Sequence, residues 1–188
     1  MENELIQTTG GSAVTTDNRT IEQTEPLYLY ISSARLVLMS ILSFGIYEVY
    51  WLYKNWWYLK NREHLDIKPF WRGWFGIFFC HSLLHHIYND DECNAIQQPQ
   101  FSHSTLATIW VILILIANIV GRFPGATLSM MSALIPSYLC FVPVQNYINS
   151  VMKKRSPSLR HYRWSAGHTV SLVPGLIIWI LLFIVMNA

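Results

Sequence analysis

The sequence predicts an all-α integral membrane protein, and its composition and hydropathy pattern carry that prediction. Hydrophobic residues make up 52% of the 188 residues and charged residues only 13%, with a mean hydropathy of +0.27. Soluble domains carry about 25% charged residues, so this chain has too few to coat a globule in water. Apolar runs alternate with short basic clusters, as in multi-pass helical proteins, whereas nucleic-acid binding calls for one dense cationic face.

We expect one membrane domain preceded by a polar tail. Residues 1–26 contain five acids against Arg19 and predict a disordered acidic tail. Residues 27–188 predict a single transmembrane helical domain, with helices at approximately 35–63, 70–90, 104–121, 126–152 and 169–187. The expected architecture is a helical bundle with four full spans plus a short re-entrant or interfacial helix, and five spans remain the alternative.

Residues 43–74 mark the membrane interface. They hold five of the eight tryptophans together with Lys54, Lys60, Arg62, Lys68 and Arg72. Tryptophan and tyrosine concentrate at headgroup depth, and cations prefer the wet side. The first span, Leu36 to Tyr53, would reach about 27 Å as a helix. Pro69 disfavours helix at Lys68, so the stretch predicts the bend of a helical hairpin.

The charge distribution tests whether the second apolar run, Phe70 to Tyr88, crosses the membrane. If all five segments span, seven basic residues lie on one side and six on the other. If the second does not, ten lie on one side and three on the other. The positive-inside rule favours the second arrangement. It places two basic clusters in the cytoplasm, the first from Lys54 to Arg72 and the second from Lys153 to Arg163.

Three segments resemble a known family: FGIYEVYWLYKNW (44–56), PFWRGWF (69–75) and PVQNYIN (143–149). The chain is similar to small bacterial multi-pass inner-membrane proteins classed as a domain of unknown function and marked by an FGIYxxYWxYKNW signature. The resemblance implies a location in the bacterial inner membrane. It implies no activity, no cofactor and no catalytic residues.

Two sets of polar residues within apolar segments are candidate sites. Glu48 lies inside the first predicted span, where an ionisable residue needs a partner, and Arg72 is the expected counter-charge. Gln145, Asn146 and Asn149 follow the prolines of the fourth segment. Gln145 and Asn149 lie one turn apart, so they either bond between helices or line a polar cavity.

A histidine cluster is the candidate metal site. His81 and His85 share one helix face, and His86 and an acidic run follow. The competing interpretation is a set of partly wet residues at a membrane boundary. The spacing of Cys80, Cys93 and Cys140 indicates small buried hydrophobes rather than a disulfide framework.

The leading functional interpretation is a structural or interaction component rather than an enzyme, and no cofactor is expected. One alternative is a small transporter or channel subunit with a polar site at Glu48, Arg72, Gln145 and Asn149. Another is a membrane-embedded metal-dependent enzyme. Under any of these interpretations, the expected partners of the protein are the lipid bilayer and another membrane protein or a second copy of the chain. Anionic headgroups are expected at Lys153, Lys154, Arg155, Arg160 and Arg163.

Overall fold

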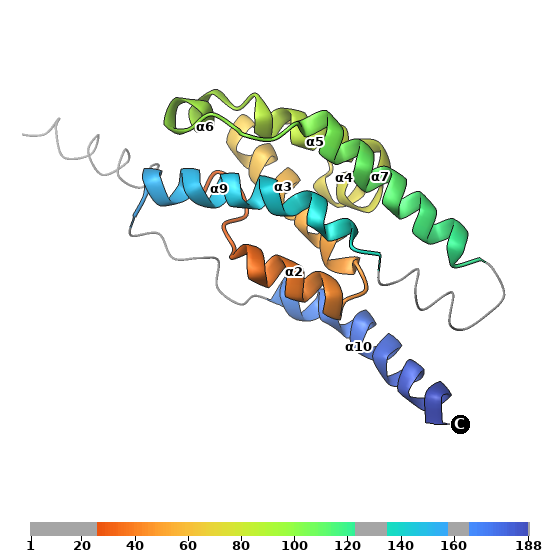
Figure 1. Ribbon diagram of the computed structural model, residues 1–188. Helices are drawn as coiled ribbons and strands as arrows, with labels where there is room; N and C mark the ends of the chain where they lie inside the picture. The colour runs from red at the N-terminus through yellow and green to blue at the C-terminus, as the bar shows by residue number, and fades with distance from the viewer. Residues whose placement is uncertain (1–25, 123–134, 158–165, 188) are drawn as a thin grey trace, which may run out of the picture.

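The computed structural model describes residues 26–122, 135–157 and 166–187, and these are helical with no strand among them (Figure 1). The prediction of an all-α fold is confirmed. The helices are α2 (Ser33–Leu42), α3 (Ile46–Glu63), α4 (Pro69–Trp74), α5 (Gly76–Tyr88), α6 (Asp91–Ile96), α7 (His103–Val120), the 3-10 helix η1 (Ser137–Phe141), α9 (Val142–Arg155) and α10 (Ala166–Asn187). The predicted acidic tail, up to residue 25, lies outside the described residues.

The expected continuous helix over 35–63 is wrong, because the chain reverses between α2 and α3. Phe44 and Gly45 both have positive φ, 50° and 83°, which ends α2 and favours glycine at the second position. The Gly45 N–H donates to the Ser40 carbonyl at 2.9 Å, closing the turn. The N–H of Leu29, before α2, donates to Asn55 on α3 at 3.1 Å. The first apolar run is therefore a helical hairpin rather than one span (Figure 1).

A second hairpin follows directly. Pro69 occupies the first turn of α4, where its missing N–H costs nothing. Gly73 of α4 lies against the backbone of Tyr53, an approach that no side chain at this position would permit. The chain turns at Phe75, and α5 runs back along α3, so that the rings of His86 and Trp56 lie 5.9 Å apart. The second apolar run thus enters and returns beside α3.

The core forms where α7, η1 and α9 close over these hairpins. The ring of Phe141 stacks on Trp51 at 4.6 Å and contacts Trp110 of α7 at 5.3 Å. A non-helical segment, Leu27–Ile31, lies inside this core, with every residue at most 7% exposed. Cys80, Cys93 and Cys140 are buried and free, as predicted.

One end of the molecule gathers charged groups from distant parts of the chain, and we call it the charged end. It contains Tyr28, Arg62 at the end of α3, Asp90 and Glu92 beside α6, and Arg155 at the end of α9. Away from the charged end, Trp110 of α7 donates a hydrogen bond to Glu48 near the start of α3. α7 then continues for ten residues beyond Trp110, and α10 extends past the α2–α3 turn (Figure 1).

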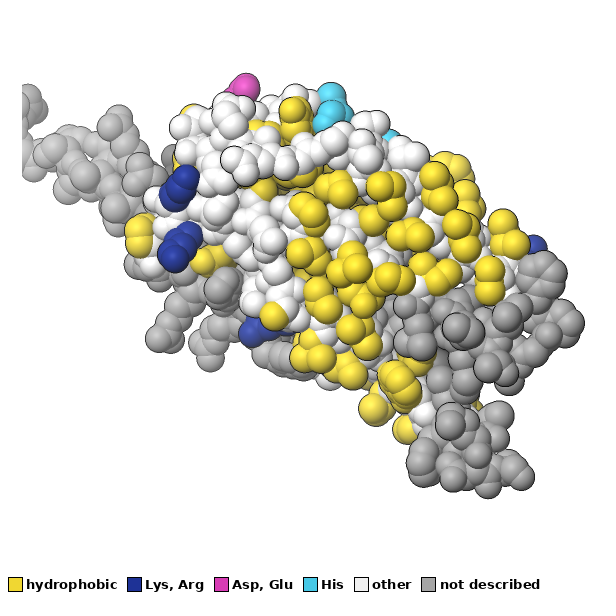
Figure 2. Space-filling view, viewed as in Figure 1, with side chains coloured by type: hydrophobic (Ala, Val, Ile, Leu, Met, Phe, Trp, Pro, Cys, Tyr) yellow, Lys and Arg dark blue, Asp and Glu magenta, His cyan; other side chains and the backbone are white. Residues whose placement is uncertain are grey.

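The surface between the charged end and the far ends of α7 and α10 is largely apolar. Figure 2 shows hydrophobic side chains spread over α7 and the neighbouring face, with lysine and arginine side chains at the end where α9 stops. Within the described residues, α7 is the one helix long and apolar enough to cross a membrane by length and composition. The predicted bundle with four full spans is not confirmed.

Candidate functional site

A row of buried polar side chains runs along one face of α3, and we call it the polar seam. Its members are Glu48, Trp51 and Asn55, spaced three and four residues apart and therefore aligned on a helix. Glu48 is 2% exposed. Its carboxylate accepts hydrogen bonds from Trp110 Nε1 at 2.5 Å and Ser137 Oγ at 2.7 Å. Neutral donors from α7 and η1 therefore satisfy the carboxylate that sequence analysis singled out.

The expected pairing of Glu48 with Arg72 is wrong. The Arg72 guanidinium carbon lies 4.4 Å from the ring centre of Trp56 and 5.3 Å from that of Phe79. The prediction assumed a straight first span with both residues at equal depth. The reversal at Gly45 instead places Glu48 at the start of α3, while α4 sets Arg72 beside the middle of that helix.

Gln145 joins the polar seam from α9. Its Oε1 accepts a hydrogen bond from Trp51 Nε1 at 2.7 Å. Its Nε2 lies 3.0 Å from the Leu29 carbonyl oxygen, 3.1 Å from that of Ile31 and 3.0 Å from Asn149 Oδ1. Gln145 and Asn149 thus come together as the spacing predicted. Their contacts join α9 to α3 and to the buried Leu27–Ile31 segment.

Asn55 and Asn146 complete the polar contacts around this segment. Asn55 Nδ2 donates to the Trp51 carbonyl at 2.9 Å, while its Oδ1 accepts the Leu29 N–H. Asn146 faces outward, and its Oδ1 accepts a hydrogen bond from Ser33 Oγ at 2.5 Å. The backbone of the Leu27–Ile31 segment lies outside a helix, so the Asn55 and Gln145 amides supply partners for its buried backbone groups.

At the charged end, Asp90 is the common acceptor of a three-residue cluster. Tyr28 Oη donates to its Oδ2 at 2.6 Å, and Arg62 donates to the same oxygen at 2.5 Å. The Cys93 N–H donates to Oδ1 at 3.1 Å, which makes Asp90 the N-cap of α6.

Charge and burial act in opposite directions on this cluster. Burial raises the pKa of Asp90, but the hydrogen bond from Tyr28 and the Arg62 charge outweigh it, so this pKa lies below its ordinary value. Burial likewise lowers the pKa of Arg62, yet the neighbouring Tyr28 and Asp90 raise it above its usual range. Asp90 and Arg62 therefore form a stable ion pair at neutral pH.

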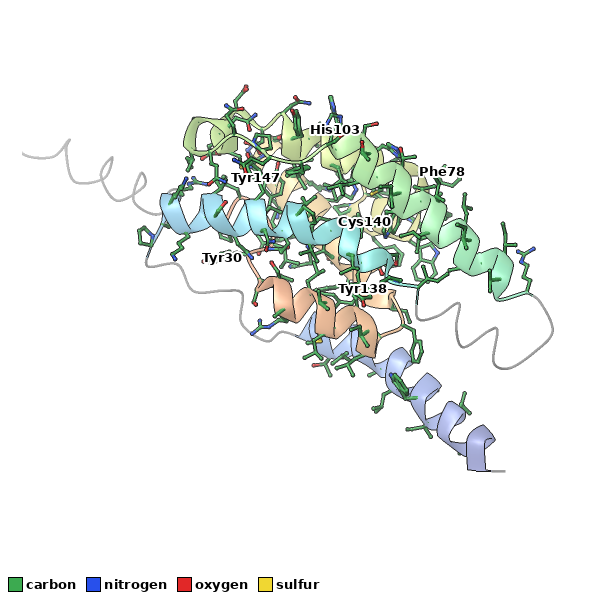
Figure 3. All side chains as sticks on the ribbon, in the orientation of Figure 1. Tyr30, Phe78, His103, Tyr138, Cys140 and Tyr147 are labelled. Atoms are coloured by element: carbon green, nitrogen blue, oxygen red, sulfur yellow. The ribbon has the colours of Figure 1, made fainter. Side chains whose placement is uncertain are left out.

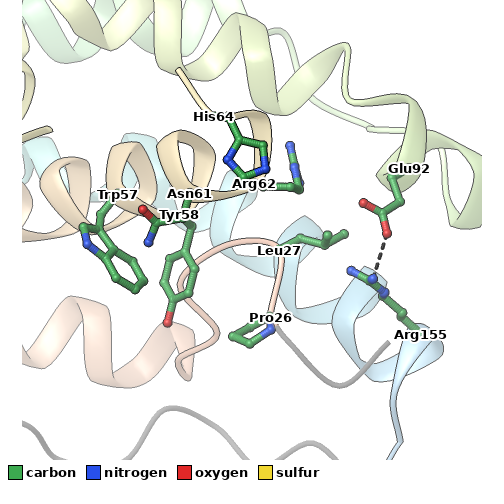
Figure 4. A pocket seen from close by; sticks show the side chains of 9 residues that line it. All are labelled: Pro26, Leu27, Trp57, Tyr58, Asn61, Arg62, His64, Glu92 and Arg155. Carbon is green, nitrogen blue, oxygen red and sulfur yellow. Dashed lines mark ion pairs between the residues drawn. The ribbon is translucent and has the colours of Figure 1, made fainter. Parts of the chain in front are cut away.

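A cavity of about 350 Å³ opens beside this cluster (Figure 4). Arg155 and Glu92 form an ion pair at 2.7 Å across one side of it. The lining residues are Pro26, Leu27, Trp57, Tyr58, Asn61, Arg62, His64, Glu92 and Arg155. Because Glu92 and the nearby Asp90 balance two of these cations, the cavity does not select strongly for a charged ligand.

The histidines do not form the predicted metal site. His81 Nε2 lies 3.1 Å from Thr108 Oγ1, and the His85 and His103 rings approach to 3.4 Å between nitrogens. Figure 3 shows His103 at the start of α7. His86 packs edge-on against Trp56. In the described ranges, no group of three or more histidine, cysteine, aspartate or glutamate side chains is placed to hold a metal ion.

The second basic cluster is only partly described. Lys153 and Lys154 are exposed in the last turn of α9, where cations favour the helix C-terminus. Arg155 pairs with Glu92. Arg160 and Arg163 lie outside the described residues.

Sequence reasoning missed several partners of the seam. Trp110 and Ser137 belong to no sequence motif. Each becomes a hydrogen-bond donor to Glu48 only through the packing of α7 and η1. Tyr28 belongs to an apolar run, LYLYI at residues 27–31, that directly follows the acidic tail. That run was a usable signal, because five such residues in a row rarely remain in water.

Comparison of the chain with models of protein families, with curated proteins and with solved structures finds no match in any of the three. The resemblance of residues 44–56, 69–75 and 143–149 to small bacterial inner-membrane proteins therefore stays a prediction.

Proposed function

We propose that the chain is a multi-pass protein of the bacterial inner membrane that serves as a structural or interaction component. The observation that carries this proposal is the exposure of α7. Of its 18 residues only Ala107 and Trp110 are buried, while Ile112 is 48% and Ile119 59% exposed. A continuous apolar surface of this length requires lipid or a protein partner to cover it.

The arrangement of the charged end supports one topology. The ends of α3 and α9 meet there, which brings Lys60 and Arg62 to the same side as Lys153, Lys154 and Arg155, the side that the positive-inside rule assigns to the cytoplasm. In this proposal α7 crosses outward, and the chain returns to the charged end through η1 and α9. The hairpins α2–α3 and α4–α5 enter from the cytoplasmic side and return to it.

α10 is the proposed final crossing. Its 22 residues contain no charged side chain and would reach about 33 Å as a helix, close to the thickness of the hydrocarbon layer. Leu176 is 63%, Leu181 56% and Ile184 56% exposed, so the helix presents apolar side chains beyond the body of the protein. The proposed membrane crossings are therefore three: α7, the segment through η1 and α9, and α10.

The polar seam favours a structural role over transport. A transport site must present polar groups to a water-filled path. Here Glu48 is held by Trp110 and Ser137, and Gln145 is held by Trp51 and two backbone carbonyls. These bonds use the polar groups for packing between helices, which is their common role inside membrane proteins.

Cysteine labelling of the full chain tests this topology. The three buried native cysteines are replaced by alanine, and either Asn89→Cys, near the charged end, or Arg122→Cys, after the far end of α7, is introduced. Isolated membranes should retain the protein through alkaline carbonate extraction. A membrane-impermeant thiol reagent should label Arg122→Cys from the periplasm and Asn89→Cys only in inverted vesicles. Release by carbonate, or labelling of both positions from one side, contradicts the proposal.

A further inference from the structure

A groove between α3 and α4 is lined by two lysines and four aromatic side chains. Its volume is about 470 Å³. The lining residues are Tyr53, Trp57, Lys60, Asn61, Lys68, Pro69, Phe70 and Trp71. The close approach of Gly73 to Tyr53 fixes α4 against α3 and so forms the floor where the two helices meet.

The charge of this groove is unbalanced, in contrast to the cavity at the charged end. No aspartate or glutamate is among its lining residues, although Asp66 lies two positions before Lys68. Within the described residues, neither Lys60 nor Lys68 takes part in an ion pair. Two lysines therefore line one opening that no carboxylate lines.

The groove runs along α3, from near the charged end toward the start of the helix. Lys60 lies two residues before Arg62 of the charged end, whereas Tyr53 lies about 10 Å farther along α3, by the helical rise. Phe70 and Trp71 are 57% and 52% exposed beside the deeper part. The same aromatic surface continues through Trp74, at 63%, and Phe78, at 76%. Cations above exposed aromatic rings match the layers of a lipid headgroup and its acyl chains.

We infer that this groove binds the phosphate headgroup of an anionic phospholipid through Lys60 and Lys68. Trp57, Phe70 and Trp71 contact the glycerol and upper acyl region. The inference deepens the proposed function and rests on it, because it gives the membrane component a preferred lipid. It places the preferred lipid site in the α3–α4 groove, so that Lys153 and Lys154, in the last turn of α9, serve as the comparison pair outside the groove.

The test titrates the full chain in detergent micelles with short-chain phosphatidylglycerol, phosphatidylcholine or inorganic phosphate, and follows tryptophan fluorescence. The matched variants are Lys60→Gln/Lys68→Gln and Lys153→Gln/Lys154→Gln, which remove the same charge from different places. A cation near an anionic surface is worth about a fivefold change in binding, so the first double variant should weaken phosphatidylglycerol binding by about 30-fold. The second double variant should change it less than about threefold. A Lys60→Arg/Lys68→Arg variant should keep most of the affinity.

Three results would overturn the inference. One is equal affinity of the unmodified protein for phosphatidylglycerol and phosphatidylcholine. Another is an equal loss in both glutamine variants, which would indicate net charge rather than a site. The third is displacement of phosphatidylglycerol by inorganic phosphate at a similar concentration, which would indicate a free-phosphate site. If carbonate retains the protein while the two lipids bind alike, only this inference fails and the proposed membrane function stands.

Discussion

Replacing Asp90 is the sharpest test of how the charged end stabilises the fold. The Asp90 residue is 8% exposed and accepts three hydrogen bonds, from Tyr28, Arg62 and the Cys93 N–H. Asp90→Ala removes all three and leaves the Arg62 guanidinium without its main counter-charge. Removal of one partner of a buried ion pair costs about 3–5 kcal/mol, so we expect a loss of that size in the free energy of unfolding.

Asp90→Asn separates the charge from the other contributions. Asparagine keeps the size of the side chain and remains a good N-cap for α6. The loss should therefore fall to about 2 kcal/mol, the usual strength of a hydrogen bond between charged groups. In a double-mutant cycle with Arg62→Gln, the coupling energy should be similar, about 1.5–3 kcal/mol.

The pH dependence has a defined sign. The folded state lowers the pKa of Asp90 below its ordinary value of about 3.9. The ion pair therefore contributes fully above that pH, and its contribution falls as the pH drops through the folded pKa. The unmodified protein should lose stability on the acid side of about pH 4, and Asp90→Asn should lose less over the same interval.

Denaturant unfolding of the full chain in one detergent, from pH 7 down to pH 3, measures these quantities. A Glu63→Gln variant is the control, because Glu63 also contacts Arg62 at 3.1 Å but is exposed. Its effect should stay below about 1 kcal/mol. A loss below about 1 kcal/mol for Asp90→Ala, or identical acid profiles for Asp90→Asn and the unmodified protein, would refute the reasoning.

Three further substitutions test the hairpins and the polar seam, each measured by the same unfolding assay. Gly45→Ala should cost about 1 kcal/mol, because φ is +83° there, and an unchanged stability would contradict the tight turn between α2 and α3. Gly73→Ala should cost about 1–3 kcal/mol, because its Cβ would lie 2.8–2.9 Å from Tyr53 and force α4 away from α3; an unchanged stability would contradict this packing. Gln145→Leu should cost about 2–4 kcal/mol, since buried carbonyls of the Leu27–Ile31 segment lose their donor, and a neutral result would show that other donors replace it.

The sequence pattern predicted the simple helices and the bend before Pro69, but it missed the reversal between α2 and α3. Residues 104–121 were expected as a helix, and α7 runs from His103 to Val120, because long apolar periodicity depends little on context. The predicted helix end at residue 63 coincides with the last residue of α3, Glu63. The reversal at Phe44 and Gly45 was missed, because the apolar pattern of the sequence continues unbroken through the turn.

The candidate site was predicted in its members and missed in its partners. Glu48 and Gln145 stood out because buried polar groups inside apolar runs require partners. Which partners they find depends on contacts across 62 to 116 positions of the chain, as with Trp110 for Glu48 and Leu29 for Gln145. Local sequence carries no signal for such distances, and the prediction therefore chose Arg72, a basic residue expected at the same depth as Glu48 in the predicted hairpin.

The buried Leu27–Ile31 segment has a consequence for how the protein is made. Leu29 and Ile31 are synthesised early, but their carbonyls are paired by Gln145, which follows Leu29 by 116 residues. At about 5–20 residues per second, the ribosome needs roughly 6–25 s to supply that partner. Both hairpins and α7 emerge during this interval, while the carbonyls of Leu29 and Ile31 still lack the Gln145 donor. Completion of the fold is thus coupled to synthesis of α9, and a chain interrupted before Gln145 would leave its earliest hydrophobic residues open to proteases and chaperones.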